Sequence, residues 1–400
     1  MSALDTALDA IRAQLDALTR AGLARRRVSL DGAQRPRVSI GGETLLSFCS
    51  NDYLGLAADE RIGLALIQAV QRYGVGSGGS HLVIGHTAAH DALERDLADF
   101  TGQARALFFG SGYLANMGVL GALAGREDVI VSDALNHASL IDGMRLTRAR
   151  VARVPHCDVA AVGEALAHAR DARARFVVTE GVFSMDGDTP DIPALLELCD
   201  RFDAWLVIDD AHGFGVLGRS GGGVLRHFDV RSPRIVYVGT LGKAAGVSGA
   251  FAAAAEPVIE LILQRARSYI YTTASPAFVA AALQASLAII REEGWRREKL
   301  GRLTAMLKTG LEALPAKLGR SQSAIQPLIL GDNARAIGVS EALRRRGVIV
   351  SAIRPPTVPE GTARLRISLS AAHEEADVRL LLECLAAVMS GAPTWQPVSS

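Results

Sequence analysis

Residues 234–250, RIVYVGTLGKAAGVSGA, join a buried-strand pattern to a lysine surrounded by small residues. The run RIVYVGT is β-branched and aromatic and ends at Gly239, which is typical of a short buried strand. Lys243 therefore follows the carboxyl end of a strand, in a loop whose Gly, Ala and Ser side chains are too small to shield it. Ligand sites of open α/β sheets gather at that edge. The stretch predicts an α/β fold in which Lys243 has a functional role.

Short apolar runs alternate with helical patterns from about residue 60 to residue 275. Because these runs are apolar on both faces, they predict a mostly parallel sheet with helices on both faces. The predicted strands are 106–109, 128–133, 175–180, 204–210, 234–240 and 249–255.

The patterns also predict how the chain divides. Residues 1–27 are predicted to form an amphipathic helical arm, and residues 36–48 a short hairpin. Beyond residue 280, long helical stretches mixed with a few strand patterns predict a smaller C-terminal α+β domain. The predicted parts are an arm and hairpin (1–50), a large domain (51–278) and a small C-terminal domain (279–400).

The composition favours an ordinary globular protein. The formal net charge of +1 gives no global attraction to nucleic acid or to an acidic membrane. No apolar stretch reaches the roughly 18 residues of a membrane span, and the N-terminus lacks the apolar core of a signal peptide. Cysteines without a CxxC pair argue against a disulfide framework and against a zinc site. We expect a cytoplasmic protein whose cysteines are Cys49, Cys157, Cys199 and Cys384.

Three short motifs match known signatures but lack the context that each requires. GFGVLG (213–218) fits the dinucleotide pattern, yet GRSGGG follows where a helix must open. GRSGG (218–222) fits the serine-hydrolase elbow, but no strand leads into its serine. His86, His90 and Glu94 can share a helix face, but no third strong ligand is nearby. We therefore predict no metal site.

Chemistry-bearing residues follow the ends of several predicted strands. The Gly-Ser-Gly of FFGSGYLAN (108–116) precedes a helix, where backbone N–H groups can hold a phosphate. Each residue alone has a structural explanation, but their coincidence at one sheet edge does not. The other strand ends supply His137, Glu180, Ser184, Asp209, His212, Thr240 and Lys243.

These residue types suit pyridoxal 5′-phosphate. A lysine forms the Schiff base with this cofactor, and an acidic residue partners its pyridinium nitrogen. At about 3 Å and an effective dielectric of about 20, an aspartate favours the protonated ring by about 5 kcal/mol. That free energy corresponds to about four pKa units. One histidine can stack on the ring and a second can hydrogen-bond its phenolic oxygen, so we predict Lys243 as the covalent anchor.

A family resemblance rests on SNDYLGL (50–56), GSGGS (76–80), NHASL (136–140), TEGVFSMDGD (179–188), DDAHG (209–213) and GKAAGVSGA (242–250). These stretches resemble the α-oxoamine synthases, pyridoxal-phosphate transferases of the aspartate aminotransferase fold, fold type I. SAIQPLILGDN (323–333) and AIRPPTVPEGTARLRISLSAAHE (352–374) resemble the alanine-using members that serve biotin synthesis. The resemblance implies that the substrates are L-alanine and a pimeloyl thioester, carried on coenzyme A or on acyl carrier protein.

The resemblance also implies roles for individual residues by matching position. Lys243 would be the Schiff-base lysine and proton shuttle, and Asp209 would meet the pyridine nitrogen. His212 would lie near the phenolic oxygen, and His137 would stack on the ring. The predicted cofactor-binding residues further include Gly112, Tyr113, Glu180, Ser184 and Thr240.

Other matching positions concern the substrates and a partner subunit. Thr272 or Thr273 of YIYTTASP would reach the cofactor phosphate of the partner, so a homodimer is implied. Arg366 would pair with the amino-acid carboxylate, beside Asn51. The remaining positions that match substrate contacts are Arg25 and Thr357.

Three positions depart from the family pattern, and some alternatives stay open. His81, His86 and Asn136 stand where glycine, an aromatic residue and serine are usual, so the acyl-chain details stay open. The glycine-using relatives, glycine C-acetyltransferase and 5-aminolevulinate synthase, are disfavoured by AIRPPTVP. A non-catalytic regulatory subunit would not need Lys243, and a Rossmann oxidoreductase would bind NAD instead.

Overall fold

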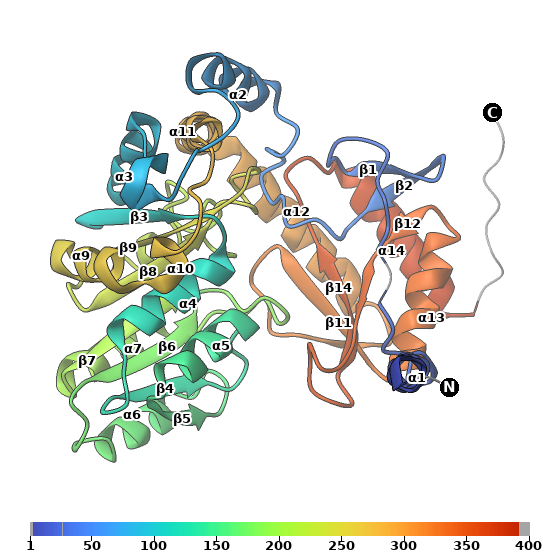
Figure 1. The fold of residues 1–400 in the computed structure, drawn as a ribbon. Helices are drawn as coiled ribbons and strands as arrows, with labels where there is room; N and C mark the ends of the chain where they lie inside the picture. The colour runs from blue at the N-terminus through green and yellow to red at the C-terminus, as the bar shows by residue number, and fades with distance from the viewer. Residues whose placement is uncertain (1–2, 26, 392–400) are drawn as a thin grey trace.

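The structure is a computed structural model that describes residues 3–25 and 27–391. Figure 1 shows two packed parts, with α12 (Gly294–Glu312) running from the larger part into the smaller one. The larger part is built on a seven-stranded sheet, and the smaller part contains two shorter sheets. None of the described helices has the length and apolar character that a membrane crossing requires.

The large sheet has the strand order β3-β9-β8-β7-β6-β4-β5. Neighbours from β8 to β5 are parallel, whereas β9 is antiparallel to both β8 and β3. The predicted α/β fold with a mostly parallel sheet is therefore confirmed. The strands are β3 (Arg105–Phe109), β4 (Val129–Asp133), β5 (Arg150–Val154), β6 (Arg175–Glu180), β7 (Ala204–Asp209), β8 (Ile235–Thr240) and β9 (Ala250–Ala254).

Both faces of this sheet are apolar because helices cover both. Phe108 of β3 belongs to one hydrophobic core and its neighbour Phe109 to the other, as the alternation of side chains along a strand requires. One face packs against α4 (Gly112–Leu123), α5 (Ala138–Thr147), α9 (Glu256–Arg265) and α10 (Arg267–Ile270). The other packs against α3 (Ala88–Thr101), α6 (Val159–Ala167), α7 (Ile192–Arg201), α8 (Val224–His227) and α11 (Ala277–Glu292), with α2 (Glu60–Tyr73) outside α11.

The smaller part contains an antiparallel sheet of order β10-β11-β14-β13. Figure 1 shows β11 and β14 facing the large part, with α13 and α14 beyond them. The elements are β10 (Lys317–Leu318), β11 (Ile325–Gly331), α13 (Asn333–Arg344), β13 (Ser351–Ile353), β14 (Ala363–Ser368) and α14 (Glu375–Met389).

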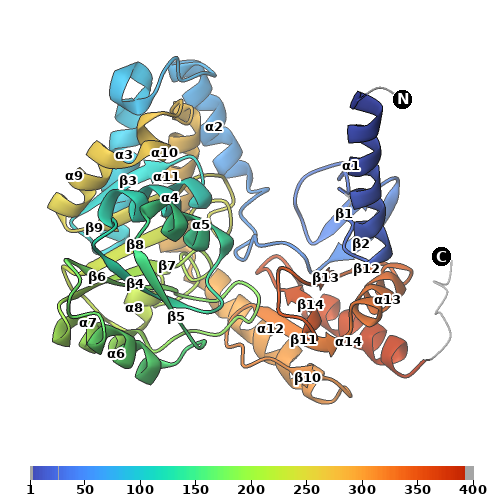
Figure 2. The same ribbon diagram turned by 60° about the horizontal axis from the view of Figure 1, so that its bottom comes forward.

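The N-terminal hairpin packs with this C-terminal part. Strand β2 (Glu43–Ser47) pairs with β1 (Arg37–Ile40) and, in parallel, with β12 (Val348–Ile349). Figure 2 shows α1 (Ala3–Arg20) standing beside these strands. The division into 1–50, 51–278 and 279–400 stays a proposal, and residues 1–2 and 392–400 lie outside the described residues.

One local prediction needs correction, and two elements were not predicted. The predicted helical arm (1–27) ends at Arg20, because Gly22 adopts a φ of +65°, a left-handed conformation that ends helices. Strand β5 was not predicted, because its sequence RVARV lies at a solvent-exposed sheet edge and lacks a continuous apolar run. The π-helix η1 (His81–Gly85) was also missed, since a single wide turn has no periodic signal.

Candidate active site

The carboxyl ends of the parallel strands place carboxylates and the lysine at one edge of the large sheet. Strand β6 ends at Glu180, β7 at Asp209 and β8 at Thr240. Glu180 and Asp209 lie at the same height along their strands, because the two residues pair directly in the register of β6 and β7. Lys243 lies in the turn that leaves β8 for its antiparallel neighbour β9.

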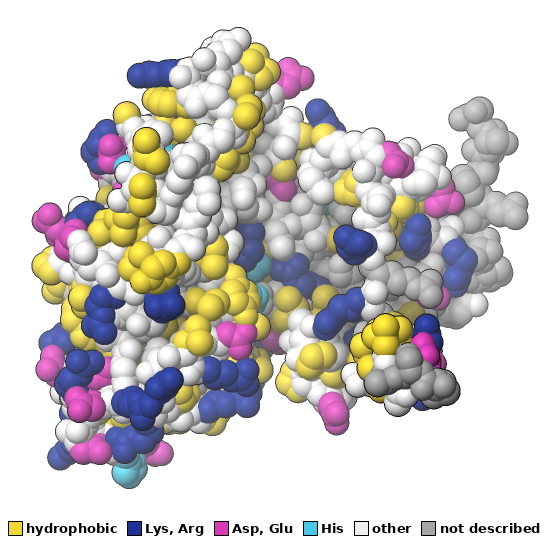
Figure 3. Space-filling model, in the orientation of Figure 1, with side chains coloured by type: hydrophobic (Ala, Val, Ile, Leu, Met, Phe, Trp, Pro, Cys, Tyr) yellow, Lys and Arg dark blue, Asp and Glu magenta, His cyan; other side chains and the backbone are white. Residues whose placement is uncertain are grey.

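Lys243 is half-buried and adjoins a histidine ring. Its Nζ lies 2.9 Å from Nε2 of His212. Burial lowers the pKa of Lys243 to about 8, although the charges of Asp209 and Glu180 oppose this shift. A lowered pKa makes the neutral, nucleophilic amine accessible near neutral pH. Figure 3 shows histidine and basic side chains in the hollow between the two parts of the molecule.

A chain of polar contacts leads from Lys243 to the smaller part. His212 Nδ1 lies 2.6 Å from Tyr53 Oη, and that hydroxyl donates to Asn51 Oδ1 at 3.2 Å. Arg366 donates to the same Asn51 oxygen at 3.1 Å and to Ser184 O at 2.7 Å. The guanidinium of Arg366 is therefore fixed in orientation and is linked to Lys243 through this chain of contacts.

A second chain leads from Asp209 to His137. Asn116, in the second turn of α4, donates to Asp209 Oδ2 at 2.6 Å and to Ser139 Oγ at 2.9 Å. The Ser139 hydroxyl lies 2.8 Å from Nδ1 of His137. Asp209 Oδ1 also accepts from Ala211 N at 3.0 Å. The carboxylate of Asp209 is thus oriented from the side of the sheet and His137 from the start of α5.

Glu180 differs in character from Asp209. Burial raises the pKa of Glu180 well above its usual range, and the charge of Asp209 raises it further. Glu180 accepts from Ser184 N at 3.1 Å through Oε2. Asp209, by contrast, accepts hydrogen bonds from Asn116 and Ala211, and an acidic residue held in this way suits a pyridinium nitrogen.

The residues present fit pyridoxal phosphate. Among the described residues, the buried oxygens Glu180 Oε1 and Thr240 Oγ1 have no hydrogen-bond partner, so polar groups are open to a bound molecule. A Cβ on Gly112 would lie 2.9 Å from the Thr240 methyl, so only glycine lets the start of α4 come this close to β8. Ser111 caps this helix by accepting from Leu114 N. Lys243, Asp209 and the amino end of α4 supply a nucleophile, an anion and phosphate-binding N–H groups.

The structure brings most of the predicted residues together. Arg25, His137, Ser184 and Thr357 line one cavity of about 650 Å³. Tyr113 is exposed, and its hydroxyl donates to Asp142. No hydrogen bond joins Thr272 or Thr273 to the other predicted site residues within the described chain, so their role toward a partner subunit stays a prediction.

Sequence reasoning missed Tyr53, Asn116 and Ser139. Each stands inside a quoted motif, but its sequence neighbours do not reveal its contact. Asn116 lies four residues after Gly112, on the same helix face, and that spacing is the signal that could have identified it.

The histidines near α3 form a cluster that differs from the expected one. His81, His86 and His90 have ligand atoms within 4.8 Å of one another. Glu94, grouped with His86 and His90 from the sequence, instead accepts from Phe108 N. His90 uses both ring nitrogens, toward Thr87 N at 3.1 Å and Ser275 O at 2.8 Å. These contacts account for His90 without an ion, and the expected absence of a metal site stays a prediction.

Comparison with known proteins places this chain in one class. Residues 43–385 match the family described as aminotransferase class I and II. The chain therefore belongs to this class of pyridoxal-phosphate enzymes. An 8-amino-7-oxononanoate synthase of Nitrosospira multiformis is 56% identical over 356 residues, 89% of this chain and 90% of that protein. One of Cupriavidus taiwanensis is 55% identical over 383 residues, 92% and 95% of the two chains. Within the class, the chain is a member of the 8-amino-7-oxononanoate synthase family.

Solved structures agree on the fold. A serine palmitoyltransferase of Sphingomonas wittichii superposes with a TM-score of 0.90 at 31% identity, covering 98% of this chain and 100% of that one. The 8-amino-7-oxononanoate synthase of Francisella tularensis has a TM-score of 0.76 at 30% identity, covering 87% and 98%. The predicted fold type, cofactor and enzyme family are confirmed.

Proposed function

We propose that the enzyme condenses L-alanine with a pimeloyl thioester, on coenzyme A or acyl carrier protein, and releases carbon dioxide and the thiol to give 8-amino-7-oxononanoate. The relatives' names support the product and its place in biotin synthesis. The observation that carries the substrate proposal is that one residue belongs to both substrate sites. Ser184 lines the cavity, and its backbone carbonyl accepts a hydrogen bond from Arg366. A carboxylate-binding guanidinium thus adjoins a cavity for an acyl chain.

Each residue of the site has a proposed task. Pyridoxal phosphate, when bound, supplies the electron sink that stabilises negative charge on the α-carbon of the amino acid. Lys243 Nζ, with its pKa lowered to about 8, can accept the α-proton and return it later. His212 receives the hydrogen bond of Lys243 Nζ and orients it. His137, which lines the cavity, would donate a hydrogen bond to the oxygen that becomes negative when the thioester carbonyl is attacked.

Arg366 is the proposed carboxylate-binding residue. Its side chain is buried, and hydrogen bonds to Ser184 O, Asn51 Oδ1 and Ser368 Oγ fix its orientation. A fixed guanidinium binds a carboxylate without losing further rotamer freedom, so it selects α-amino acids over amines.

The cavity suits a thioester with an apolar chain and a polar end. Ile141, Phe183, Met185 and Val358 give it apolar walls, and Arg25 and Arg153 add positive charge. Apolar walls favour the methylene groups of a pimeloyl chain. The arginines favour an anionic group, such as the terminal carboxylate or the carrier.

The deciding experiment measures carbon dioxide and free-thiol release from pimeloyl-CoA with L-alanine or glycine, in the wild type and in Lys243→Ala. Turnover with alanine alone, lost in the variant, is the expected result. The alternative is a glycine-using α-oxoamine synthase such as glycine C-acetyltransferase. Turnover with glycine and a shorter acyl-CoA, but none with alanine, would overturn the substrate assignment and leave fold and cofactor unchanged.

A further inference from the structure

An ionic cluster of one buried and two half-buried side chains joins two loops that line the substrate cavity, and the proposed chemistry does not use it. His156 stands in the loop between β5 and α6, with Nδ1 at 3.0 Å from Asp133 Oδ1 and Nε2 at 3.1 Å from Asp188 Oδ2. Two carboxylates facing both ring nitrogens require both to donate, so the ring is an imidazolium. Burial lowers the pKa of His156, but the hydrogen bonds with Asp133 and Asp188 outweigh burial and raise it to about 12.

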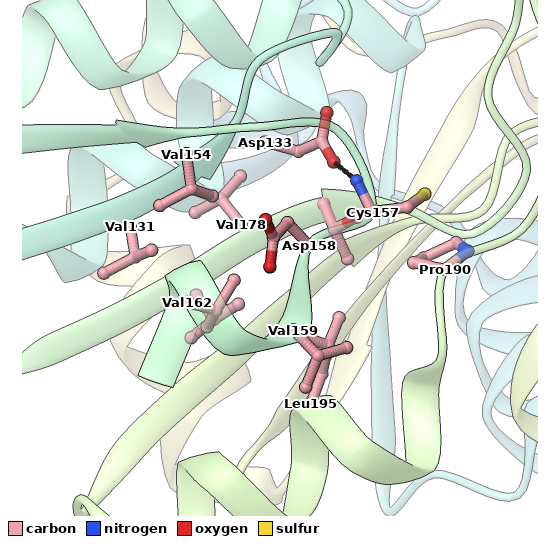
Figure 4. A pocket seen from close by; sticks show the side chains of 12 residues that line it. Val131, Asp133, Val154, Cys157, Asp158, Val159, Val162, Val178, Pro190 and Leu195 are labelled. Atoms are coloured by element: carbon pink, nitrogen blue, oxygen red, sulfur yellow. Dashed lines mark hydrogen bonds between the residues drawn. The ribbon is translucent and has the colours of Figure 1, made fainter. Parts of the chain in front are cut away.

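Asp133 holds the first of two loops. It ends β4, and its carboxylate accepts from Leu135 N at 2.8 Å and from Cys157 N at 2.7 Å. Figure 4 shows the bond to Cys157 at the rim of a small pocket between α6 and the sheet, whose labelled walls are mostly valines and Leu195. With a volume of about 20 Å³, the pocket has room for about one water. Asp133 therefore depends on the backbone and on His156 for its partners.

Asp188 closes the second loop. Its carbonyl accepts from Phe183 N at 2.9 Å, and Gly187 N donates to Phe183 O at 2.8 Å, so residues 183–188 form a compact turn. The His156 ring also packs edge-on against Phe183, with ring centroids 4.3 Å apart. One side chain thus holds this turn by an ion pair and by a ring contact.

Both loops form walls of the cavity that His156 itself does not line. Leu135 and His137 come from the first loop, and Phe183 and Ser184 from the second. The second loop also carries the carbonyl of Ser184 that receives Arg366. A change in the spacing of the loops would therefore move a cavity wall and the proposed carboxylate-binding residue together.

We propose that His156 is a positioning residue that fixes the spacing of loops 133–137 and 183–188, and thereby the width of the acyl-substrate cavity. The substrate part of this inference rests on the proposed function. Displacements well below the size of a methylene are enough to weaken binding in a preorganised site.

The test compares His156→Gln with His168→Gln, both as holoenzymes. Glutamine carries no charge, and its two N–H donors lie on one nitrogen, so it cannot reproduce the donors on the two separate nitrogens of the His156 ring. His168 caps α6 through Glu164 O on the exposed surface, so its variant is the matched control. In His156→Gln we expect the KM for pimeloyl-CoA to rise by about tenfold, the size of effect expected for lost charge-assisted hydrogen bonds. The preference for pimeloyl-CoA over shorter and longer acyl-CoA should narrow, while the control stays at wild-type values.

Hydrogen exchange followed by mass spectrometry supplies a readout that is independent of activity. Residues 133–137 and 183–188 should exchange faster together in His156→Gln and not in the control. If the variant loses only thermal stability, with KM, chain-length preference and exchange of both loops unchanged, the role is merely structural and the proposal is overturned. Asp188→Asn removes the negative charge from one of the two bonds, leaving at most a weaker neutral acceptor, and serves if His156→Gln does not fold. The same shifts should then appear, smaller in size, and their absence overturns the proposal equally. A wild type that does not use pimeloyl-CoA overturns the proposed function alone, because loop exchange still decides the role of His156.

Discussion

Lys243 Nζ lies 2.9 Å from Nε2 of His212, and the opposite nitrogen of the same ring lies 2.6 Å from Tyr53 Oη. Burial lowers the pKa of His212 well below its usual range, and the charge of Lys243 lowers it further. A neutral imidazole with its proton on Nδ1 accepts from Lys243 and donates to Tyr53. The ring therefore orients the lysine without adding a second positive charge.

The pKa of Lys243 predicts how apoenzyme takes up its cofactor. Only the neutral amine attacks the aldehyde, and burial lowers the pKa of Lys243 to about 8. The neutral fraction rises with pH and reaches one half at the pKa, so the attachment rate should increase through about pH 8 and level off about one pH unit above it. Stopped-flow absorbance on adding pyridoxal phosphate measures this rate, with Lys243→Ala as the control that shows no attachment. A rate that keeps rising to pH 10 would contradict the lowered pKa.

Arg366→Lys should weaken amino-acid binding. Lysine keeps the charge but loses the planar fork that Ser184 O and Asn51 fix in place. We expect the KM for alanine to rise about 10- to 100-fold, since hydrogen bonds to charged groups contribute about 1.5–3 kcal/mol. Initial rates at varied alanine measure it. Arg379→Lys, at an exposed pair with Glu375, is the control that should leave KM unchanged.

Asn116→Ala should weaken cofactor binding without removing the acid. Asp209 would lose the 2.6 Å hydrogen bond that orients Oδ2, and its buried oxygen would gain no other partner. The dissociation constant of pyridoxal phosphate should rise by about tenfold. Titration of apoenzyme gives this constant. Ser268→Ala removes a hydrogen bond to the Leu114 carbonyl of the same helix but leaves the bond between Asn116 and Asp209 in place, so this variant should bind the cofactor normally.

The backbone conformation of Cys157 indicates that a substitution there can stabilise the protein. Its φ of 55° is in the left-handed region, which costs most side chains about 1–2 kcal/mol but which asparagine tolerates. Cys157→Asn should therefore raise the free energy of unfolding by part of that amount. Cys157→Val places a β-branched side chain there and should lower it. Thermal unfolding of both variants gives the comparison, and equal shifts would argue against backbone strain as the cause.

The sequence patterns predicted those features that depend on neighbouring residues in the chain. Apolar runs ended by turns located Asp209 and Thr240 at strand ends, because periodicity and turn chemistry act within a few residues. The same logic missed β5, whose edge position lets arginines replace the apolar alternation. An apolar run predicts a strand because buried positions are apolar. A solvent-exposed strand such as β5 has few apolar residues and is therefore hard to predict.

Long-range contacts were beyond local patterns. Asn116 meets Asp209 across 93 positions and Tyr53 meets His212 across 159. In the sequence, Asn116 is an ordinary helix residue. Its role follows only from the fold, which brings α4 to the end of β7 where Asp209 lies. The ion pairs of His156 with Asp133 and Asp188 depend in the same way on where two loops meet.

Two glycines near Lys243, Gly242 and Gly246, lie in the same loop but differ in how an added side chain would fit. Gly246 has a φ of +69°, and a Cβ there would lie 2.5 Å from the backbone carbonyl carbon of Leu56. Gly246 N also donates to Lys243 O at 2.9 Å, so this turn holds the lysine. Gly242, one residue before Lys243, would place its Cβ 3.9 Å from the nearest atom, an ordinary contact.

Gly246→Ala should therefore destabilise the apoenzyme by more than about 2 kcal/mol, the sum of left-handed strain and a clash with backbone that cannot yield. Gly242→Ala should change the free energy of unfolding by no more than about 0.5 kcal/mol. Denaturant unfolding of both apoenzymes measures the difference. If the two alanines cost the same, the loop needs small residues for access to Lys243 rather than for its close approach to Leu56.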